Sequence, residues 1–317
     1  MNPGGIDLLE TYRLGLAMNT FVRTLFPAFA IAAILFQSTI AATPEKTKMT
    51  DAEAKMFTVS SGYERYMGRW SRLLAPVYIG FAGVKNGERV LDVGAGTGAL
   101  TSALEAALTS SELLCIDPSE GFINYAKKNA KSGRVSFEVG DAQALRFKDA
   151  SFDHTMSMLV MNFIPDHDKA IAEMRRVTRP QGVVSSCVWD YNAGMQSLRF
   201  FWDEVVALDP GMEPKDERNM KLTREGQLGQ LWRKAGLVNV QEKALAIDQS
   251  YQSFDDYWGP RLTGVGPGGA YVVSLTEERR RQLEARLRKR LLGNRDDGAF
   301  VLKAQVRCVR GDVPKTS

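Results

Sequence analysis

Short apolar runs alternate with helical patterns through the middle of the chain. The runs are typical of buried strands and lie at residues 89–93, 112–116, 135–139, 152–158 and 182–189. Segments of helical character separate them, at 98–108, 119–130 and 168–177. Strands that alternate with helices of this length form crossover connections, so the pattern predicts a parallel sheet with helices on both faces.

After residue 190 the alternation is less regular. Helices are predicted at 198–206 and 228–235, and a strand at 237–247. Apolar and polar residues then alternate over 299–309, which predicts a last strand with one buried and one wetter face.

Ahead of the first strand, residues 62–76 form a further predicted helix. Tyr63, Tyr66 and Trp70 fall at helical spacing in it, and Pro76 is expected to close it. Aromatic residues at such spacing are more often part of a core than of a catalytic site. Both interpretations remain open for these three residues.

Residues 1–48 differ in character from the rest. An apolar run at 25–36 follows Arg13 and Arg23 and precedes small residues, as in a secretory signal. The run is shorter than the roughly 20 apolar residues that span a bilayer, so we expect no stable membrane span. Because Met49 begins a polar, helix-forming stretch, residues 1–48 are alternatively an extension from a misassigned start. We expect a cytoplasmic protein, or an exported or membrane-associated one if the run is a genuine signal.

Charge and composition argue against a nucleic-acid or lipid surface and against a metal site. The net charge of +4 is concentrated in residues 277–290, where Leu283, Leu287 and Leu291 recur every four residues. This spacing indicates the charged solvent face of a helix more than a nucleic-acid or lipid patch. The 3 cysteines are far apart and the 2 histidines stand beside no cysteine pair, so we expect no metal site.

The first candidate site is the sequence VLDVGAGTG, where the first strand turns into the first helix. Gly94, Gly96 and Ala99 match a dinucleotide-binding fingerprint. Glycines at such a turn let backbone amides approach a ligand, and the start of a helix favours a negative group. By itself the loop is also compatible with a tight turn that binds nothing, although a ligand-binding loop is favoured.

Acidic residues follow the next two strands. Asp117 ends the second strand and Asp141 comes just after the third, while Met158 ends the fourth. The carboxyl ends of parallel strands meet at one edge of a sheet, so we expect these residues to lie near the glycine loop. A carboxylate at the second strand's tip can accept the hydroxyls of a ribose.

Five segments together resemble the successive motifs of class I S-adenosylmethionine-dependent methyltransferases. They read VLDVGAGTG, CIDPSEGF, GDAQAL, FDHTMSMLVMNFIPD and EMRRVTRPQGVV. The similarity covers about residues 62–190 and is greatest to bacterial small-molecule enzymes akin to the ubiquinone/menaquinone-biosynthesis methyltransferases. It implies a doubly wound α/β fold: a mainly parallel, Rossmann-like seven-stranded sheet with the last strand, 299–309, inserted antiparallel, and a helical cap insertion.

The resemblance also implies a cofactor site for S-adenosyl-L-methionine. Its residues would be Asp92 at the ammonium group, Gly94, Ala95 and Gly96 along the methionine and ribose, Asp117 at the ribose hydroxyls, Pro118 beside the adenine, Asp141 and Ala142 at the adenine amino group, and Met158 and Leu159 near the sulfonium. An N-terminal lid helix would turn Tyr63, Tyr66 and Arg69 toward cofactor or substrate. Arg69 is a candidate clamp for the cofactor carboxylate, or else a surface charge.

The acceptor side is less defined. Asn162 and Phe163 follow the fourth strand, where family members often place acceptor contacts. His154 is expected to be a packed strand residue and His167 a helix-start residue, so no catalytic base is named. The cap aromatics suit an apolar acceptor or an ordinary core; they are Phe200, Phe201, Trp202, Tyr251, Phe254, Tyr257 and Trp258.

Two alternatives to a methyltransferase stay open. The glycine spacing alone permits an NAD(P)-dependent oxidoreductase of Rossmann type, and a non-catalytic S-adenosylmethionine-binding protein also fits the sequence. The Ser-Met-Leu-Val sequence at the end of the fourth strand replaces the Asn/Asp-Pro-Pro-aromatic motif of adenine- or amide-directed enzymes. A small-molecule acceptor is therefore favoured over nucleic acid, while the acceptor, the methylated atom and the oligomeric state remain undetermined.

The predicted organisation has five parts. They are an N-terminal extension (1–48), a helical lid (49–80), the cofactor-binding core (81–190), an acceptor-shaping cap with a sheet strand (191–298), and the final strand and tail (299–317).

Overall fold

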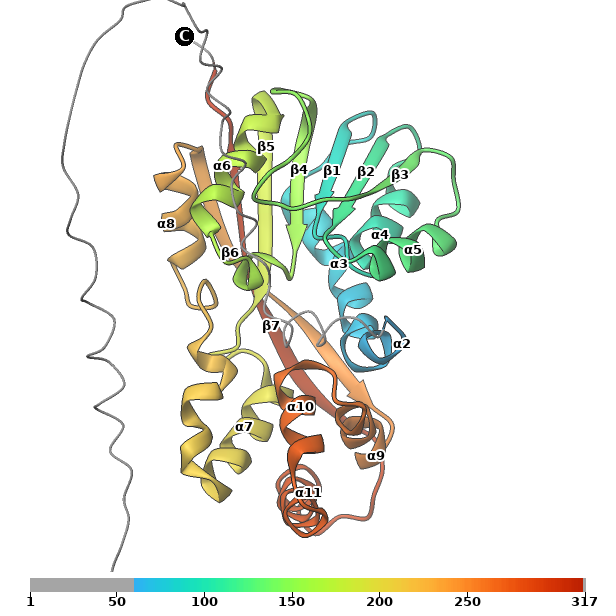
Figure 1. Cartoon of the computed structure of the whole chain (residues 1–317), viewed down its shortest axis with the longest axis vertical. Coiled ribbons are helices and arrows are strands. Elements are labelled where there is room, and N and C mark those ends of the chain that lie inside the picture. The colour runs from blue at the N-terminus through green and yellow to red at the C-terminus, as the bar shows by residue number, and fades with distance from the viewer. Residues whose placement is uncertain (1–59, 316–317) are drawn as a thin grey trace, which may run out of the picture. The chain divides into compact units, whose positions relative to one another are not determined.

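Seven strands form one mixed sheet in the computed structural model, which describes residues 60–315 (Figure 1). The strands are β1 (Arg89–Val93), β2 (Glu112–Asp117), β3 (Val135–Val139), β4 (Phe152–Met158), β5 (Thr178–Trp189), β6 (Val238–Tyr251) and β7 (Phe300–Asp312). Their order in the sheet is β3-β2-β1-β4-β5-β7-β6. Strands β1 to β5 pair in parallel and β7 is antiparallel to both its neighbours, which confirms the predicted fold.

Helices cover both faces of the sheet. They are α2 (Ser60–Tyr63), α3 (Arg69–Ala82), α4 (Ala99–Ala107), α5 (Glu120–Asn129), α6 (His167–Val177), α7 (Gln196–Leu208), α8 (Gln227–Lys234), α9 (Phe254–Trp258), α10 (Gly266–Ser274) and α11 (Glu277–Leu292), with short turns η1 (Glu64–Gly68), η2 (Met161–Phe163), η3 (Pro210–Lys215), η4 (Glu217–Asn219) and η5 (Gly259–Thr263). Val90 packs in the apolar cluster of α3 and α4, and its neighbour Leu91 in that of α6 and α8. The two-residue period of a strand thus buries both faces of β1.

The cap is built on the extended ends of β6 and β7. Residues 306–312 of β7 pair with β5, whereas residues 300–305 are paired within the sheet with β6 alone. Helices α7, α9, α10 and α11 gather at this end of the two strands (Figure 1). Tyr251 and Phe300 stack there with ring centroids 5.2 Å apart, and Tyr257 packs edge-on against Tyr251. The strand extension therefore supplies the apolar surface on which the cap helices pack.

Pro76 does not end the first long helix, contrary to the sequence prediction. It lies inside α3, which continues to Ala82 and ends at Gly83, where φ is 73°. Pro76 is exposed, so the missing helical hydrogen bond falls on the solvent side. Leu74 and Tyr78 are fully buried, and this packing holds the helix together past the proline.

The predictions for residues 1–48 lie outside the described part of the chain. The lid predicted for residues 49–80 is described from residue 60 onward. Among the helices of residues 60–315, none has the length and apolar character needed to cross a membrane.

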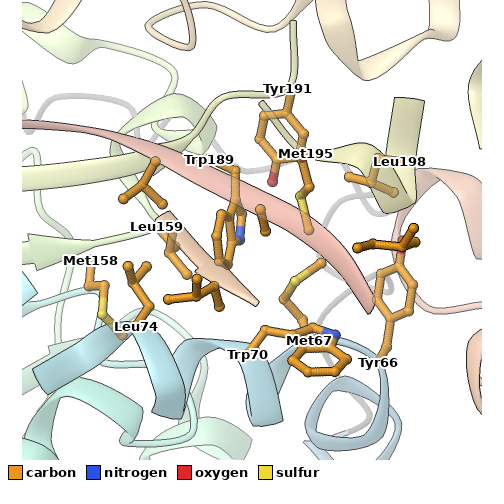
Figure 2. Close-up of a cluster of buried hydrophobic side chains, with 14 of the residues drawn as sticks. Tyr66, Met67, Trp70, Leu74, Met158, Leu159, Trp189, Tyr191, Met195 and Leu198 are labelled. Carbon is orange, nitrogen blue, oxygen red and sulfur yellow. The ribbon is translucent and has the colours of Figure 1, made fainter. Parts of the chain in front are cut away.

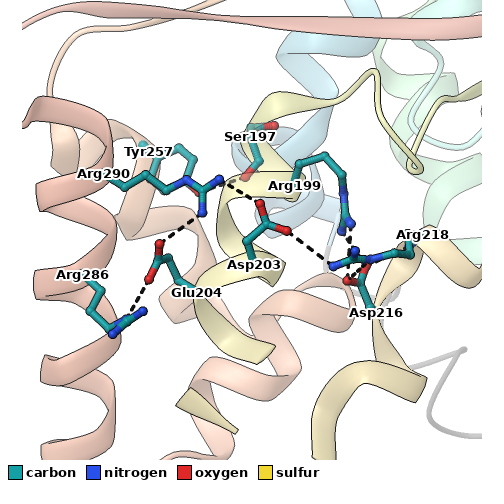
Figure 3. Close-up of polar contacts among 9 residues, drawn as sticks. All are labelled: Ser197, Arg199, Asp203, Glu204, Asp216, Arg218, Tyr257, Arg286 and Arg290. Carbon is teal, nitrogen blue, oxygen red and sulfur yellow. Dashed lines mark hydrogen bonds and ion pairs between the residues drawn. The ribbon is translucent and has the colours of Figure 1, made fainter. Parts of the chain in front are cut away.

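The arginine-rich helix α11 is tied to the cap. Its residues Leu283 and Leu287 are buried, as their spacing predicted. On another side of the helix, Arg286 and Arg290 form ion pairs with Glu204 of α7, at 2.7 and 3.1 Å (Figure 3). These contacts favour a structural role for the charge run over a nucleic-acid patch.

The cap core should be sensitive to a cavity at Leu287. The change Leu287→Ala removes a fully buried side chain, and we expect it to lower the free energy of unfolding by about 2–5 kcal/mol. Leu262→Ala is a matched control because Leu262 is 43% exposed, and it should cost no more than about 0.5 kcal/mol. Urea unfolding followed by circular dichroism measures both, and equal losses would contradict the packing described.

Candidate active site

A cavity of about 540 Å³ opens at the carboxyl ends of the parallel strands. Its wall is built by the loops that follow β1, β2, β4 and β5, together with η1, η4 and the start of α10. The volume falls within the roughly 300–1,000 Å³ of small-molecule sites. Figure 2 shows side chains from η1, from the end of β4 and from the end of β5 converging on one region. The strand-end argument from the sequence therefore led to a real cavity.

The glycine loop after β1 forms one wall, and its conformation explains the glycines. Gly94, Gly96 and Gly98 have φ values of 76°, 55° and 89°, which residues with a side chain rarely adopt. A Cβ on Gly94 would lie 2.5 Å from a methyl carbon of Val160, whereas one on Gly96 would meet open space. The loop thus brings bare backbone to the cavity at both glycines, and Gly94 also leaves room for Val160.

Asp117 is the most firmly positioned acid of the cavity. Its two carboxylate oxygens accept hydrogen bonds from the backbone N–H groups of Gly96, at 3.0 Å, and Ser119, at 2.9 Å. A carboxylate has about four lone-pair sites, so each oxygen can accept one further bond. Burial raises the pKa of Asp117 to about 6, although both backbone bonds act to lower it. The side chain is held ready for a ligand with two neighbouring donors.

Asp92 lies at the end of β1 behind the glycine loop and is 2% exposed. Thr101 donates a hydrogen bond of 2.8 Å to one of its oxygens, and the other, Oδ1, is buried with no partner among the described residues. Burial, together with the charge of Asp117, raises its pKa to about 7, against the lowering effect of the Thr101 bond. Asp92 is not part of the cavity lining. Its unpartnered oxygen is nevertheless a free acceptor for a donor group.

Leu159 follows β4 and combines a cavity position with a strained backbone. It has φ 65°, a value that costs a residue with a side chain about 1 kcal/mol or more. Its N–H donates to the carbonyl of Cys187 at 2.7 Å, which fixes it against β5. Met158 and Leu159 both line the cavity.

The far end of the cavity is aromatic. Tyr66 of η1, Phe163 after β4, and Trp189 and Tyr191 at the end of β5 line it, whereas Tyr63 of α2 packs on Phe122 of α5, with ring centroids 5.7 Å apart. Tyr66 is in the π-helical turn η1, and such turns often occur at functional sites. The Tyr66 hydroxyl and the Trp189 indole nitrogen are buried and have no hydrogen-bond partner among the described residues.

Glu217 adds an acid to this aromatic end. It is the first residue of η4, lines the cavity and is 5% exposed. The indole N–H of Trp202 donates to its Oε2 at 2.6 Å. Burial raises the pKa of Glu217 to about 7, although the Trp202 bond and the charges of Arg199 and Arg261 lower it.

Several residues that the sequence singled out lie elsewhere. Asp141 is exposed and bonds to the backbone N–H of Gln143 at 2.8 Å, and Ala142 is buried outside the cavity lining. Arg69 pairs with Asp256 at 2.7 Å and stacks on Trp70.

Asn162 and the cap aromatics are also outside the lining. Asn162 donates to the sulfur of Met220 at 3.6 Å. The cap aromatics form the cap core, with Phe200 half-buried at its edge. His154 is buried in β4 between Ser185 and Glu88, and His167 begins α6, both as expected.

Residues 60–315 contain no group of three or more His, Cys, Asp or Glu side chains arranged to hold a metal ion.

Sequence reasoning missed Trp189, Tyr191 and Glu217. The first two follow directly from the strand-end argument, which was applied to four strands but not to β5. Glu217 is on an irregular segment whose position depends on how the cap packs on the sheet, and no local pattern marks it.

Comparison with known proteins fits this geometry. Residues 91–186 match the family model described as a methyltransferase domain, which spans β1 to most of β5. Residues 91–186 are therefore similar to a methyltransferase domain. The resemblance seen in the sequence is confirmed, and the alternative of a nicotinamide oxidoreductase is not favoured.

Curated relatives are similar over this part of the chain. The demethylmenaquinone methyltransferase of Renibacterium salmoninarum is 38% identical over 114 residues, which are 36% of this chain and 45% of the relative. The malonyl-[acyl-carrier protein] O-methyltransferase of Methylococcus capsulatus is 34% identical over 118 residues, 37% of this chain and 42% of the relative. The matched region spans less than half the length of these relatives.

Solved structures share the fold. Phosphoethanolamine N-methyltransferase 2 of Haemonchus contortus, in complex with S-adenosylhomocysteine and phosphomonomethylethanolamine, aligns with a TM-score of 0.51 and 18% identity, over 81% of this chain and 57% of that chain. A methyltransferase bound to the Haloferax volcanii Trm112 activator aligns with a TM-score of 0.52 and 20% identity, over 84% of this chain and 100% of that chain.

Substitutions in the glycine loop should separate backbone strain from steric contact. Gly94→Ala and Gly96→Ala both place a side chain at positive φ, which costs about 1 kcal/mol each. Gly94→Ala also drives a methyl group into Val160, so it should cost about 1–3 kcal/mol more. The two Val160 methyls would lie 2.5 and 2.6 Å from the added Cβ and the Val160 Cβ 3.0 Å from it, so rotation of the side chain moves away only one of the two methyls. Urea midpoints measure the losses.

A second-site change checks the cause. Val160→Ala combined with Gly94→Ala should recover part of the extra loss, whereas Val160→Ala with Gly96→Ala should recover none. Equal losses for the two single alanine variants would show that Val160 does not constrain the loop.

Proposed function

We propose that this chain is an S-adenosylmethionine-dependent methyltransferase that acts on a small-molecule acceptor. The observation that carries the proposal is Asp117, held by two backbone N–H groups at the tip of β2 in the cavity wall, beside bare glycine backbone. The methyltransferase domain match over residues 91–186 supports the reaction class.

The residues present fit the cofactor. Asp117 would accept the ribose hydroxyls, with Pro118 beside the adenine and the backbone of Gly94, Ala95 and Gly96 along the methionine part. The unpartnered oxygen of Asp92 suits the ammonium group of the amino-acid end. When bound, S-adenosylmethionine supplies an electrophilic methyl group.

We also propose the remaining predicted cofactor contacts, for which the supporting observations differ. Met158 and Leu159 line the cavity and would lie near the sulfonium. Asp141 and Ala142 lie outside the cavity lining, and we propose that they contact the adenine. Arg69 is engaged with Asp256, so a contact with the cofactor carboxylate would require it to exchange that partner.

The acceptor is proposed to bind between the lid and the cap. The lining there comes from Tyr63, Tyr66 and Phe163, together with Trp189 and Tyr191. Flat aromatic faces suit an apolar or aromatic small molecule better than a nucleic-acid strand, since no lysine or arginine of the described residues lines the cavity. A cytoplasmic location follows from the same proposal, because the cofactor is a metabolite of the cell interior.

Asp117→Asn tests the cofactor site. Replacing the carboxylate removes charge-assisted hydrogen bonds, each worth about 1.5–3 kcal/mol, so the affinity for S-adenosylhomocysteine should fall about 10- to 100-fold. Isothermal titration calorimetry measures the affinity. Asp149→Asn is a control because the Asp149 side chain is 78% exposed, and it should bind like the wild type.

Calorimetry with NAD completes this test. We expect S-adenosylhomocysteine to bind and NAD not to bind. A wild-type protein that binds NAD and fails to bind S-adenosylhomocysteine would sink the proposal.

Affinity for S-adenosylhomocysteine should depend on pH. Asp117 and Asp92 have pKa values raised to about 6 and about 7 by burial, and the ligand's donors favour their charged forms. Binding should therefore tighten from about pH 5 to about pH 8, as both groups lose their protons, and then level off. In Asp117→Asn the lower step should disappear. A flat profile in the wild type would contradict a role for either acid.

A further inference from the structure

The aromatic end of the cavity holds a carboxylate for which the cofactor site has no use. Glu217 comes from η4 in the cap, whereas the cofactor-site residues come from the loops after β1 and β2. In the sheet order, β4 and β5 lie on the other side of β1 from β2, so the wall that continues to Trp189 and Tyr191 is distant from Asp117's strand. Glu217 is therefore placed at the acceptor end.

The position of Glu217 is fixed, and it retains hydrogen-bonding capacity. Trp202 is 1% exposed and donates to Oε2 at 2.6 Å, which holds the carboxyl group from behind. A carboxylate accepts more than one hydrogen bond, so Glu217 can take a proton donor from a molecule in the cavity. Burying a carboxylate costs free energy, and a buried acid with a raised pKa that lines a cavity is a candidate functional group.

The positive side chains that stabilise the charged form of Glu217 lie outside the cavity lining. Arg199 of α7 and Arg261 of η5 act on it from outside the lining, and Asp216 opposes them. Tyr66 of the lid and Tyr191 after β5 face the same charge, and burial raises the pKa of both tyrosines well above the usual range. At neutral pH these hydroxyls are protonated, so Glu217 is the proton acceptor at this end.

Two buried donors accompany the acid. Tyr66 and Trp189 line the same cavity, and the Tyr66 hydroxyl and the Trp189 indole N–H are buried with no partner among the described residues. A hydroxyl group can donate its O–H to Glu217 and accept at its oxygen from either of these groups. An ammonium group can only donate, and a carboxylate or phosphate would meet the charge of Glu217.

We propose that Glu217 is the acceptor-binding general base and that the acceptor is an uncharged aromatic molecule with a hydroxyl group. The inference rests on the proposed methyltransferase function. The hydroxyl oxygen forms the new bond to the methyl carbon, the carbon–sulfur bond breaks, and the sulfur keeps the electron pair. The hydroxyl proton passes to the Glu217 carboxylate and then to water. The products are the aromatic methyl ether and S-adenosylhomocysteine.

Three matched probes test the class of acceptor. Calorimetry on the protein saturated with S-adenosylhomocysteine, at about pH 8, compares 2-naphthol, 2-naphthylamine and 2-naphthoate. The wild type should bind 2-naphthol about tenfold more tightly than the other two, because only the hydroxyl both donates and accepts well and carries no charge. Equal or tighter binding of 2-naphthoate, or no binding of any probe, would overturn the assignment.

Glu217→Gln tests the residue. The amide oxygen can still accept from Trp202, so the fold should persist, while the preference for 2-naphthol over 2-naphthoate should shrink to about threefold or less. Glu213→Gln is a matched control on the neighbouring exposed turn and should keep the wild-type preference. An unchanged preference in Glu217→Gln would overturn the role of Glu217.

The pH profile of methyl transfer separates a base from a binding group. A base works in its charged form, and the Glu217 pKa is about 7, so kcat/KM for 2-naphthol should rise through neutral pH and level off. Glu217→Gln should lose this rise and most of kcat. Binding of 2-naphthol without transfer, or the same pH profile in Glu217→Gln, would contradict the base.

The binding of S-adenosylhomocysteine distinguishes the two proposals. If the wild type fails to bind it, the proposed function itself is wrong. If wild type and Glu217→Gln bind it equally well and also treat the three probes alike, only the assignment of Glu217 is wrong.

Discussion

The parallel alignment of the strand ends is the constraint on which the site depends. Val93 pairs with Ile116 and Asp117 with Val139, so the ends of β1, β2 and β3 lie side by side. Gly94 and Ala95 then donate their N–H groups to the carbonyl of Ile116, which ties the glycine loop to β2. A one-residue slip between β1 and β2 would turn every side chain to the other face and separate Asp117 from Gly96. The position of the acid is thus a consequence of backbone pairing.

The inserted strand β7 links this half of the protein to the cap. One part of it pairs with β5 and its other part continues with β6 into the cap, so β7 fixes the position of α7, and α11 packs on α7. The Arg199–Asp216 ion pair and the Trp202–Glu217 hydrogen bond then join α7 to the segment that carries Glu217 (Figure 3 shows the first of these). The two ends of the cavity therefore belong to one connected framework of strands and helices.

Sequence patterns predicted the parts of the protein that local periodicity controls. The strands 89–93 and 152–158 were predicted with the bounds that the structure has, because buried runs between clear turns have little freedom in their ends. The stop at Pro76 was wrong because tertiary packing of Tyr78 outweighed a local helix breaker. Asp117 was placed in the cavity by a strand-end rule that needs only the order of elements. Glu217 and the Trp202 bond required the packing of the cap, which no periodicity in the sequence encodes.

The acidic residues of the lining make the cavity favour a positively charged ligand. Asp117, Glu120 and Glu217 line it, and no lysine, arginine or histidine of the described residues does so. Buried carboxylates without basic neighbours in the wall attract a cation, and burial raises the pKa values of Asp117 and Glu217 despite the groups that stabilise their charged forms. Under the proposed function, the positive charge of the sulfonium offsets part of this cost until the methyl group has moved. After the transfer the sulfonium charge is gone and Glu217 is protonated. The acidic lining therefore binds both products less tightly than the substrates. The acids that favour binding of the substrates thus also favour release of the products.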